Sequence, residues 1–541
     1  MPLRETAPGP GPAPGHTHDR DAAMPDTGLT WEDLAALVGA LDAGPHAAGS
    51  ATARATEKLR AALGQAGGVA PAVDPALLRI DYAVRGEVER HGAALAARLA
   101  AGERLGFDDL LMCNIGNPQA VGQKPLTFVR EVLALLDHPA LLDAAGTRGL
   151  FAEDAVARAR RFLRETPGGT GAYGHSKGLP RIREAVARFV EARDGVAADP
   201  DAIYLTDGAS SGIAKVLRLL LTGPGDAVLT PAPQYPIYAA CAAALGGHAE
   251  GYTLDEAAGW DVTRENLERA LAACRNAGRR AKALVLINPG NPTGRVLRED
   301  RLVEIAGFCA EHGLWLLADE VYQENVYTPG VRFVSARAAV RAAGLSRAVP
   351  VISFHSVSKG TLGECGRRGG YVEMTGAPPE ARAALDRLVS VRLCANLSGQ
   401  VAVDLMVDPP RPGAPSHDRH VAERAAILSR LAANARLVET RLSALEGISC
   451  QPIEGAMYAF PRIACPPGAV AAAARAGRAP DLAYCLSLME ATGLCAVPGG
   501  GFGVAADGFH IRLTILPPPE RLGPALDRFA AHHAHWMDAH G

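Results

Sequence analysis

The sequence lacks the long apolar runs and the excess of one charge that mark membrane and nucleic-acid-binding proteins. None of its stretches approaches the roughly eighteen consecutive apolar residues that a helix needs to cross a bilayer, so we expect no membrane partner. Its 55 Lys and Arg residues nearly balance its 58 Asp and Glu residues, and the formal net charge is −3. That balance gives no overall attraction to polyanions, so we expect no nucleic-acid partner either.

Paired cysteines and targeting segments are also missing. The ten cysteines never occur as Cys-x-x-Cys, so we expect no metal site and no disulfide framework. Residues 1–15 are rich in Pro and Gly and have no apolar segment of the kind found in secretory signals. The simplest interpretation is a cytoplasmic protein with reduced cysteines.

Two parts of the chain differ sharply in composition. Residues 1–74 are of low complexity, and we predict a disordered tail with one short helix near residues 31–41. From residue 75 onward, strand and helix patterns alternate. Strands are predicted at 202–206, 227–230, 282–287, 314–317 and 349–354, with helical patterns such as 178–193 and 213–221 between most of them. This alternation predicts an α/β fold with a mostly parallel central sheet that has helices on both faces.

The pattern changes again in the last third of the chain. A long helical segment at 418–445 is followed by short strand-like runs at 457–460 and 509–515, which is typical of a smaller α+β domain. After the tail we therefore predict three parts. Residues 75–150 contribute to the small domain, residues 151–390 form the large domain, and residues 391–541 form the C-terminal small domain.

Polar clusters follow the predicted strands. Residues 208–212 open a helix directly after a strand, where free backbone N–H groups and the helix dipole attract an anion; an ordinary capped turn would explain them equally well. Residues 288–294 contain two prolines and two glycines, which fix a loop around Asn291. A plain turn is the alternative there.

Asp319 and Lys359 each lie at the end of a very apolar strand. A carboxylate in the position of Asp319 must be paired or hydrogen-bonded, and Tyr322 follows it in the same segment; a helix cap or a structural salt bridge is the alternative. Lys359 comes with Ser356, Ser358 and Arg368, although a lone loop lysine is usually a solvated charge. In open α/β sheets, the carboxyl ends of the strands are where ligands bind.

These clusters together suit one ligand, a phosphorylated cationic heterocycle that bears an aldehyde. A lysine can form an imine with the aldehyde, and a carboxylate can keep a ring nitrogen protonated. Serines, an arginine and a helix N-terminus can hold a phosphate. The sequence therefore predicts pyridoxal 5′-phosphate as the cofactor.

Several longer motifs match a known family. They are Tyr-Ala-Val-Arg-Gly at 82–86, Cys-Asn-Ile-Gly at 113–116, Gly-Ala-Tyr-Gly at 171–174, Pro-Gln-Tyr-Pro at 233–236, and the segments 288–294, 318–323, 353–371, 390–394, 455–461 and 512–518. On these motifs the sequence resembles the alanine aminotransferases, fold-type I enzymes of the aspartate aminotransferase superfamily, from about residue 78 to residue 533. The Ser-x-Ser-Lys pattern is shared across the superfamily, whereas Glu-Cys-Gly at 364–366 favours the alanine branch.

The resemblance implies roles for the matching positions. Lys359 would be the Schiff-base lysine and the proton shuttle, and Asp319 would pair with the pyridine nitrogen. Asn291 and Tyr322 would bond the phenolic oxygen of the cofactor, and Tyr235 would stack on its ring. The residues expected to hold the phosphate are Ala209, Ser210, Ser356, Ser358 and Arg368.

Further roles implied by the resemblance concern the substrate and a second subunit. Arg512 would clamp the substrate carboxylate in a bidentate fork, with Asn291 and the backbone of Gly116 beside it. Tyr173 matches the tyrosine that reaches the phosphate across a dimer interface, so a homodimer with shared active sites is expected. From the residues alone, plain packing is the alternative for a tyrosine beside proline, such as Tyr235. For Arg512 the alternative is a surface position or a salt bridge.

The function that the resemblance implies is a ping-pong transamination, in which L-alanine and 2-oxoglutarate give pyruvate and L-glutamate. The nearest alternative is a related transaminase that uses glyoxylate or another amino acid. A non-catalytic regulator with an aminotransferase-like domain would need a helix-turn-helix segment before residue 75, and none is recognisable. The sequence departs from the family at Arg367, where a tyrosine is common, and at residues 361–362, where Thr-Leu replaces Tyr-Met.

Overall fold

The computed structural model describes residues 74, 76–77, 80 and 86–541, with gaps at 148 and 505–507. The predicted tail, except for its last residue, lies outside the described residues, as do the short helix near 31–41 and all but the last residue of the 82–86 motif. Among the described residues, no helix combines the length and the apolar character that a membrane crossing requires.

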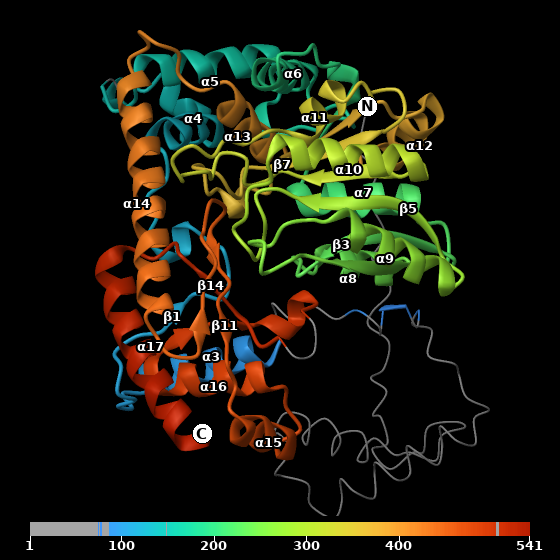
Figure 1. Cartoon of the computed structure of the whole chain (residues 1–541). Coiled ribbons are helices and arrows are strands. Elements are labelled where there is room, and N and C mark those ends of the chain that lie inside the picture. Colours follow the sequence, from blue (N-terminus) through green and yellow to red (C-terminus); the bar gives the residue numbers. More distant parts are fainter. Residues whose placement is uncertain (1–73, 75, 78–79, 81–85, 148, 505–507) are drawn as a thin grey trace, which may run out of the picture. The chain divides into compact units, whose positions relative to one another are not determined.

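A seven-stranded sheet occupies the middle of the chain (Figure 1). Its spatial order is β2-β8-β7-β6-β5-β3-β4, and every neighbouring pair is parallel except the two pairs that include β8. The strands are β2 (Ile203–Thr206), β3 (Asp226–Ala232), β4 (His248–Thr253), β5 (Arg280–Ile287), β6 (Trp315–Asp319), β7 (Val351–Ser356) and β8 (Gly370–Thr375).

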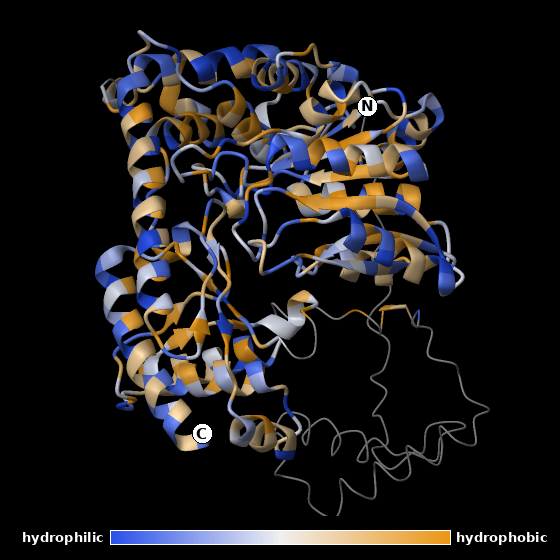
Figure 2. Cartoon of the chain, viewed as in Figure 1, coloured by the Kyte–Doolittle hydropathy of each residue, from blue (hydrophilic) through white to orange (hydrophobic). Residues whose placement is uncertain are grey.

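Alternate residues of the central strands enter two separate cores. In β5, Leu284 and Leu286 pack with α9 (Arg264–Asn276), α10 (Glu299–His312) and α11 (Ala336–Ala342). Ala283 and Val285 instead belong to the core that includes α7 (Ala209–Leu220) and α8 (Ile237–Ala244). Because successive side chains of a strand point to opposite faces, a run that is apolar throughout is buried on both sides. Figure 2 shows the apolar colouring of these strands.

Three smaller sheets lie outside the seven-stranded one. An antiparallel sheet has the order β10-β14-β13, while β1 pairs with β12 and β9 pairs with β11. These strands are β1 (Leu111–Met112), β9 (Ile448–Ser449), β10 (Tyr458–Ala459), β11 (Arg462–Ile463), β12 (Leu494–Cys495), β13 (Val497–Pro498) and β14 (Ile511–Thr514). The long helices α14 (His417–Ser443) and α17 (Pro519–His540) pack against each other beside them (Figure 1).

The remaining helices complete the two groups of elements. They are α3 (Glu87–Ala100), α4 (Thr127–Asp137), α5 (Glu153–Glu165), α6 (Pro180–Asp194), α12 (Pro379–Ser390), α13 (Leu397–Val407), α15 (Pro467–Arg475) and α16 (Pro480–Thr492). The predicted helices at 178–193 and 418–445 correspond to α6 and α14 within two residues at each end.

The sequence prediction missed two strands of the large sheet. β4 carries His, Glu and Gly and lies at the sheet edge, so its apolar pattern is weak. β8 follows a glycine-rich turn and begins at Gly370, and it runs against both of its neighbours. The mostly parallel α/β sheet is as predicted, with β8 as its antiparallel member, while the predicted domain boundaries remain predictions.

Candidate active site

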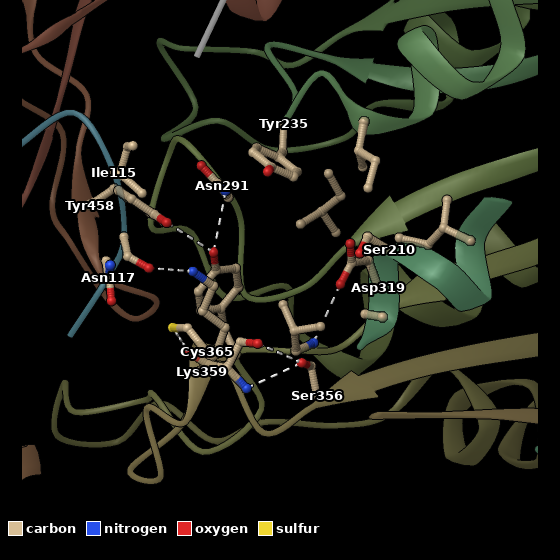
Figure 3. A pocket seen from close by; sticks show the side chains of 18 of the residues that line it. Ile115, Asn117, Ser210, Tyr235, Asn291, Asp319, Ser356, Lys359, Cys365 and Tyr458 are labelled. Atoms are coloured by element: carbon tan, nitrogen blue, oxygen red, sulfur yellow. Dashed lines mark hydrogen bonds between the residues drawn. The ribbon is translucent and has the colours of Figure 1, made fainter. Parts of the chain in front are cut away.

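Five strands of the large sheet end at one cavity of about 290 Å³. The segments at the ends of β2, β3, β5, β6 and β7 supply side chains to its wall, since the carboxyl ends of strands that run in the same direction meet at one edge of the sheet (Figure 3). Twelve residues that the sequence singled out line it: Gly116, Ala209, Ser210, Tyr235, Asn291, Asp319, Tyr322, Ser356, Ser358, Lys359, Arg368 and Arg512.

Tyr173 is the one predicted site residue that the cavity does not include. Its side chain is 81% exposed on the surface of the chain. This position is compatible with a role toward a second subunit, and that role stays a prediction.

One end of the cavity is suited to an anion. Helix α7 begins at Ala209 after Gly208, which contributes no side-chain cap, so its first N–H groups are available to a ligand. Arg368 donates to the hydroxyl of Ser210 at 3.2 Å and to that of Ser358 at 3.4 Å. The Ser356 hydroxyl lies 3.1 Å from that of Ser358.

Close packing explains the glycine that precedes this helix. Gly208 has a φ of +79°, which side chains rarely adopt, and a Cβ there would lie 2.4 Å from Nη2 of Arg368. Only glycine lets the arginine reach the start of α7. The anion site therefore depends on a residue that itself has no polar side chain.

Asp319 is a buried carboxylate without a cationic partner among the described residues. It accepts hydrogen bonds from the Tyr238 hydroxyl at 3.1 Å and from the Val321 backbone N–H at 3.4 Å. Burial raises the pKa of Asp319 to about 6, because these two bonds and the more distant charge of Lys359 offset only part of the desolvation cost. A cation placed against Asp319 would remove that cost.

Lys359 projects into the cavity from the turn after β7. Its Nζ donates to the backbone carbonyl of Gly116 at 2.7 Å and lies 5.9 Å from the ring centre of Tyr322. Burial alone would lower the pKa of Lys359, but the phenols of Tyr458 and Tyr235 and the Cys365 thiol outweigh burial and raise it. The amine is thus held inside the site by a neutral carbonyl and not by a carboxylate.

Arg512 is the most deeply buried cation of the cavity, with 1% of its surface exposed. Its Nη1 donates to the Asn291 side-chain oxygen at 3.1 Å and its Nη2 donates to the Asn114 carbonyl at 2.5 Å. Its Nε has no hydrogen-bond partner, and no described carboxylate lies within salt-bridge distance. A buried guanidinium without a counterion is costly, so the geometry favours an anionic ligand at this position.

Sequence reasoning missed several residues that line the cavity or support it. Tyr458 lies in the predicted 455–461 motif but received no role, and Tyr238 lies two residues after the 233–236 motif. A buried tyrosine usually has a hydroxyl partner, and that tendency was the only available signal for either residue. The other unpredicted lining residues are Ile115, Asn117, Ile213, Ile237, Ile287, Val321 and Cys365.

The three residues at which the sequence departs from the family pattern do not line this cavity. Arg367 forms an ion pair with Asp137 at 3.2 Å and does not line the cavity, although its neighbour Arg368 does. The Thr361 hydroxyl is bonded to Glu324 and Arg424, each at 3.1 Å, and Leu362 is buried. These three residues therefore act in packing and ion pairing around the site.

The residues present fit the cofactor that the sequence predicted. An unpaired buried carboxylate suits a protonated ring nitrogen, and the start of α7 with Arg368 and three serines suits a phosphate. The amine of Lys359 suits an aldehyde. We therefore retain pyridoxal 5′-phosphate as the group that these residues would hold.

The sequence of this chain is similar to the sequences of known proteins. The family described as aminotransferase class I and II matches residues 141–529. Mitochondrial alanine aminotransferase 2 from Arabidopsis thaliana is 46% identical over 469 residues, which cover 86% of this chain and 87% of that protein. Glutamate–glyoxylate aminotransferase 1 from the same plant is 44% identical over 461 residues, which cover 85% and 94% of the two chains.

A solved structure supports the fold assignment. Alanine aminotransferase from Pyrococcus furiosus superposes with a TM-score of 0.68 at 25% identity, and the match covers 86% of this chain and all of that one. The predicted fold class is thereby confirmed.

Proposed function

The chain belongs to the class I and II aminotransferases, and we propose that it transfers the amino group of L-alanine to 2-oxoglutarate, forming pyruvate and L-glutamate. The observation that supports this most directly is Arg512, a buried guanidinium without a counterion in the same cavity as Lys359. Every substrate of this reaction has a carboxylate next to the reacting carbon. The anion that Arg512 requires is therefore common to both half-reactions.

The chemistry at the reacting carbon requires a cofactor and a base. When bound, pyridoxal 5′-phosphate supplies an aldehyde that condenses with the amino group and a cationic ring that accepts electrons from Cα. Lys359 serves as the base, because it is the one lysine among the described residues that lines the cavity. In the first half-reaction it takes the proton from Cα of alanine. In the second it gives a proton to the corresponding carbon of the 2-oxo acid that becomes glutamate.

Three other groups fix the positions in which this proton transfer occurs. Asp319, at the end of β6, stabilises the positive charge of the ring nitrogen. Asn291 donates to the Tyr322 hydroxyl at 3.3 Å, so the two form one unit beside Lys359 and Arg512. Arg512 orients the substrate through its carboxylate, which places Cα and its proton toward the lysine.

The charges of the cavity also bear on substrate choice. Its lining includes three cationic side chains, and each already has a use: Lys359 for proton transfer, Arg368 for the phosphate and Arg512 for the α-carboxylate. Ile115, Ile237 and Ile287 make part of the wall apolar. This lining accounts for the small uncharged side chain of alanine, whereas the second carboxylate of 2-oxoglutarate has no cation of its own among these residues.

A second candidate is a glutamate–glyoxylate aminotransferase, which the 44% identical plant relative favours. Steady-state assays of the purified protein with pyridoxal phosphate separate the two. We expect a higher kcat/KM for the alanine and 2-oxoglutarate pair, measured by pyruvate formation, than for glutamate and glyoxylate. Turnover of another donor without any pyruvate from alanine would overturn the alanine assignment.

The unpaired charge of Asp319 leads to a prediction with opposite effects on stability and activity. The pKa of this carboxyl is about 6 in the folded chain and roughly 3.9 in an unfolded one, so its ionisation destabilises the cofactor-free fold. The penalty is absent below about pH 4, grows as the pH rises to about 6, and is constant above that. Asp319→Asn should therefore raise the stability of cofactor-free protein at pH 7, by up to roughly 3 kcal/mol, while lowering turnover by roughly a hundredfold.

Two measurements check this prediction. Urea unfolding of the cofactor-free proteins at pH 7 and pH 5 should show a larger advantage of the variant at pH 7. Turnover of the Asp319→Asn variant, measured at saturating cofactor, should be lower than that of the wild type. An equal advantage at both pH values would contradict the proposed ionisation.

We further propose that two copies of this chain share their active sites through Tyr173. Its exposure suits a contact with another subunit, and the resemblance assigns it to the partner's phosphate. Tyr173→Phe and Lys359→Ala homodimers should both be impaired, whereas a mixture that exchanges subunits should regain one wild-type-like site per hybrid. Activity that stays at the sum of the two parents would contradict a shared site, provided that native mass spectrometry detects hybrids.

The cytoplasmic location of the protein remains a prediction.

A further inference from the structure

Tyr458 is a buried tyrosine of the cavity to which neither the sequence motifs nor the proposed reaction assigns a part. It lies on β10, and 2% of its surface is exposed. Its ring centre is 4.4 Å from the guanidinium carbon of Arg512, and the ring of Phe502 is 4.7 Å from the same carbon. Two aromatic rings thus contact a buried arginine that forms no described ion pair.

The hydroxyl of Tyr458 is connected to Arg512 by a second route. Arg512 donates to Asn291 at 3.1 Å, Asn291 donates to Tyr322 at 3.3 Å, and Tyr322 donates to Tyr458 at 3.2 Å. The ring contact between Tyr458 and Arg512 closes this circuit. Figure 3 shows Tyr458 and Asn291 on the wall of the cavity.

This circuit leaves the Tyr458 oxygen able to accept another hydrogen bond. The Tyr322 oxygen accepts from Asn291 and gives its own proton to Tyr458. The Tyr458 oxygen therefore acts as the acceptor in the circuit, and it can accept a further hydrogen bond from an ammonium group.

The nearest group of the reaction is Lys359. A Cβ built on Gly116 would lie 2.1 Å from the Tyr458 oxygen and 3.1 Å from Nζ of Lys359, so the phenol and the amine lie on the same side of the Gly116 backbone. Burial would raise the pKa of the Tyr458 phenol, but the charges of Lys359 and Arg512 and the hydrogen bonds to Tyr322 and Lys359 lower it overall. The hydroxyl therefore interacts with the lysine that moves the proton.

We propose that Tyr458 is a positioning residue of the reaction with two separable parts: its ring orients Arg512 for the substrate carboxylate, and its hydroxyl holds the Lys359 amine. The proposal rests on the proposed function for the identity of the reaction. Both parts involve only side chains of this chain, and neither depends on a second subunit. Gly116 is required at its position because any larger residue would occupy the space of the phenol.

Two substitutions separate the two parts. Tyr458→Phe keeps the ring and removes the hydroxyl, whereas Tyr458→Leu removes both. Tyr252→Phe is the matched control, because this buried phenol donates to the Val285 carbonyl at 2.7 Å and lies outside the cavity. Melting temperatures of all the variants report on folding.

The measurements are kcat with alanine and the dissociation constant of propionate, which is alanine without its amino group. Propionate is titrated into the holoenzyme and followed by the visible absorption of the cofactor. Tyr458→Phe should lower kcat by about tenfold and change propionate binding by less than about twofold. Tyr458→Leu should also weaken propionate binding by about tenfold, and Tyr252→Phe should leave both quantities unchanged.

The proposal fails if Tyr458→Phe keeps a wild-type kcat, since the hydroxyl would then have no part in holding the lysine. It fails equally if folded Tyr458→Leu binds propionate as tightly as the wild type, or if Tyr252→Phe lowers kcat as much as Tyr458→Phe. A wild-type protein that does not use alanine would contradict the proposed function alone, because the same variants can be compared with whichever donor it does use.

Discussion

Replacement of Lys359 by alanine should abolish the visible absorption of lysine-bound pyridoxal phosphate and lower turnover by at least about 10⁴-fold. Lys359 is the only lysine that lines the cavity of the described chain, and its Nζ is held 2.7 Å from the Gly116 carbonyl. No other basic side chain there can take the Cα proton, because both arginines remain charged. The absorption spectrum and a single-turnover assay with alanine test the two effects separately.

Lys282→Ala is the matched control for this experiment. Lys282 lies near the beginning of β5, at the opposite end of that strand from Asn291, and pairs with Asp226 at 3.6 Å. The same truncation there should leave the spectrum and turnover intact. A Lys359→Ala protein with wild-type turnover would contradict the role of Lys359 as the base of the reaction.

Replacement of Arg512 by glutamine should lower kcat/KM for alanine and for 2-oxoglutarate by about 10²- to 10³-fold. Glutamine can keep a hydrogen bond toward Asn291 or the Asn114 carbonyl, but it removes the buried charge that would meet the carboxylate. The loss should affect both half-reactions, since both substrates have that group. Rapid-mixing measurements of each half-reaction give the two values.

An amine without a carboxylate distinguishes lost recognition from general damage. Ethylamine reacts without a partner for Arg512, so Arg512→Gln should lower its slow conversion much less than that of alanine. Arg411→Gln, at a side chain that is 80% exposed, should change neither. Equal losses for ethylamine and alanine would mean that Arg512 maintains the cavity and does not recognise the carboxylate.

The parts of this site that the sequence predicted share one physical property. Asn291, Asp319 and Lys359 each follow an apolar strand, and the parallel arrangement of those strands brings their ends to one edge. Local pattern and topology are then sufficient to place the residues together. The roles of Lys359 and Asp319 were predicted from their residue types together with the family resemblance, that of Asn291 from the resemblance, and all three remain proposals.

Long-range pairing explains why local patterns left Arg512 to the family resemblance and gave Tyr458 no role. Arg512 and Tyr458 lie on two short antiparallel strands, and the pairing of β10 with β14 brings their region to the cavity edge although both residues are distant from Lys359 in the sequence. Neither strand has enough residues to show an alternating pattern. β8 was missed because it begins at Gly370 after a glycine-rich turn, and its antiparallel direction follows from its neighbours and not from its own composition.

The lone carboxylate of Asp319 also has a consequence for the amount of this protein in a cell. A chain without cofactor retains an ionised buried group at neutral pH and populates its unfolded state more often than a loaded chain. Proteases degrade chains in proportion to the time they spend unfolded, so the empty form would be cleared faster. Supply of the vitamin from which pyridoxal phosphate is made would then regulate the abundance of the enzyme as well as its occupancy, at a constant rate of synthesis.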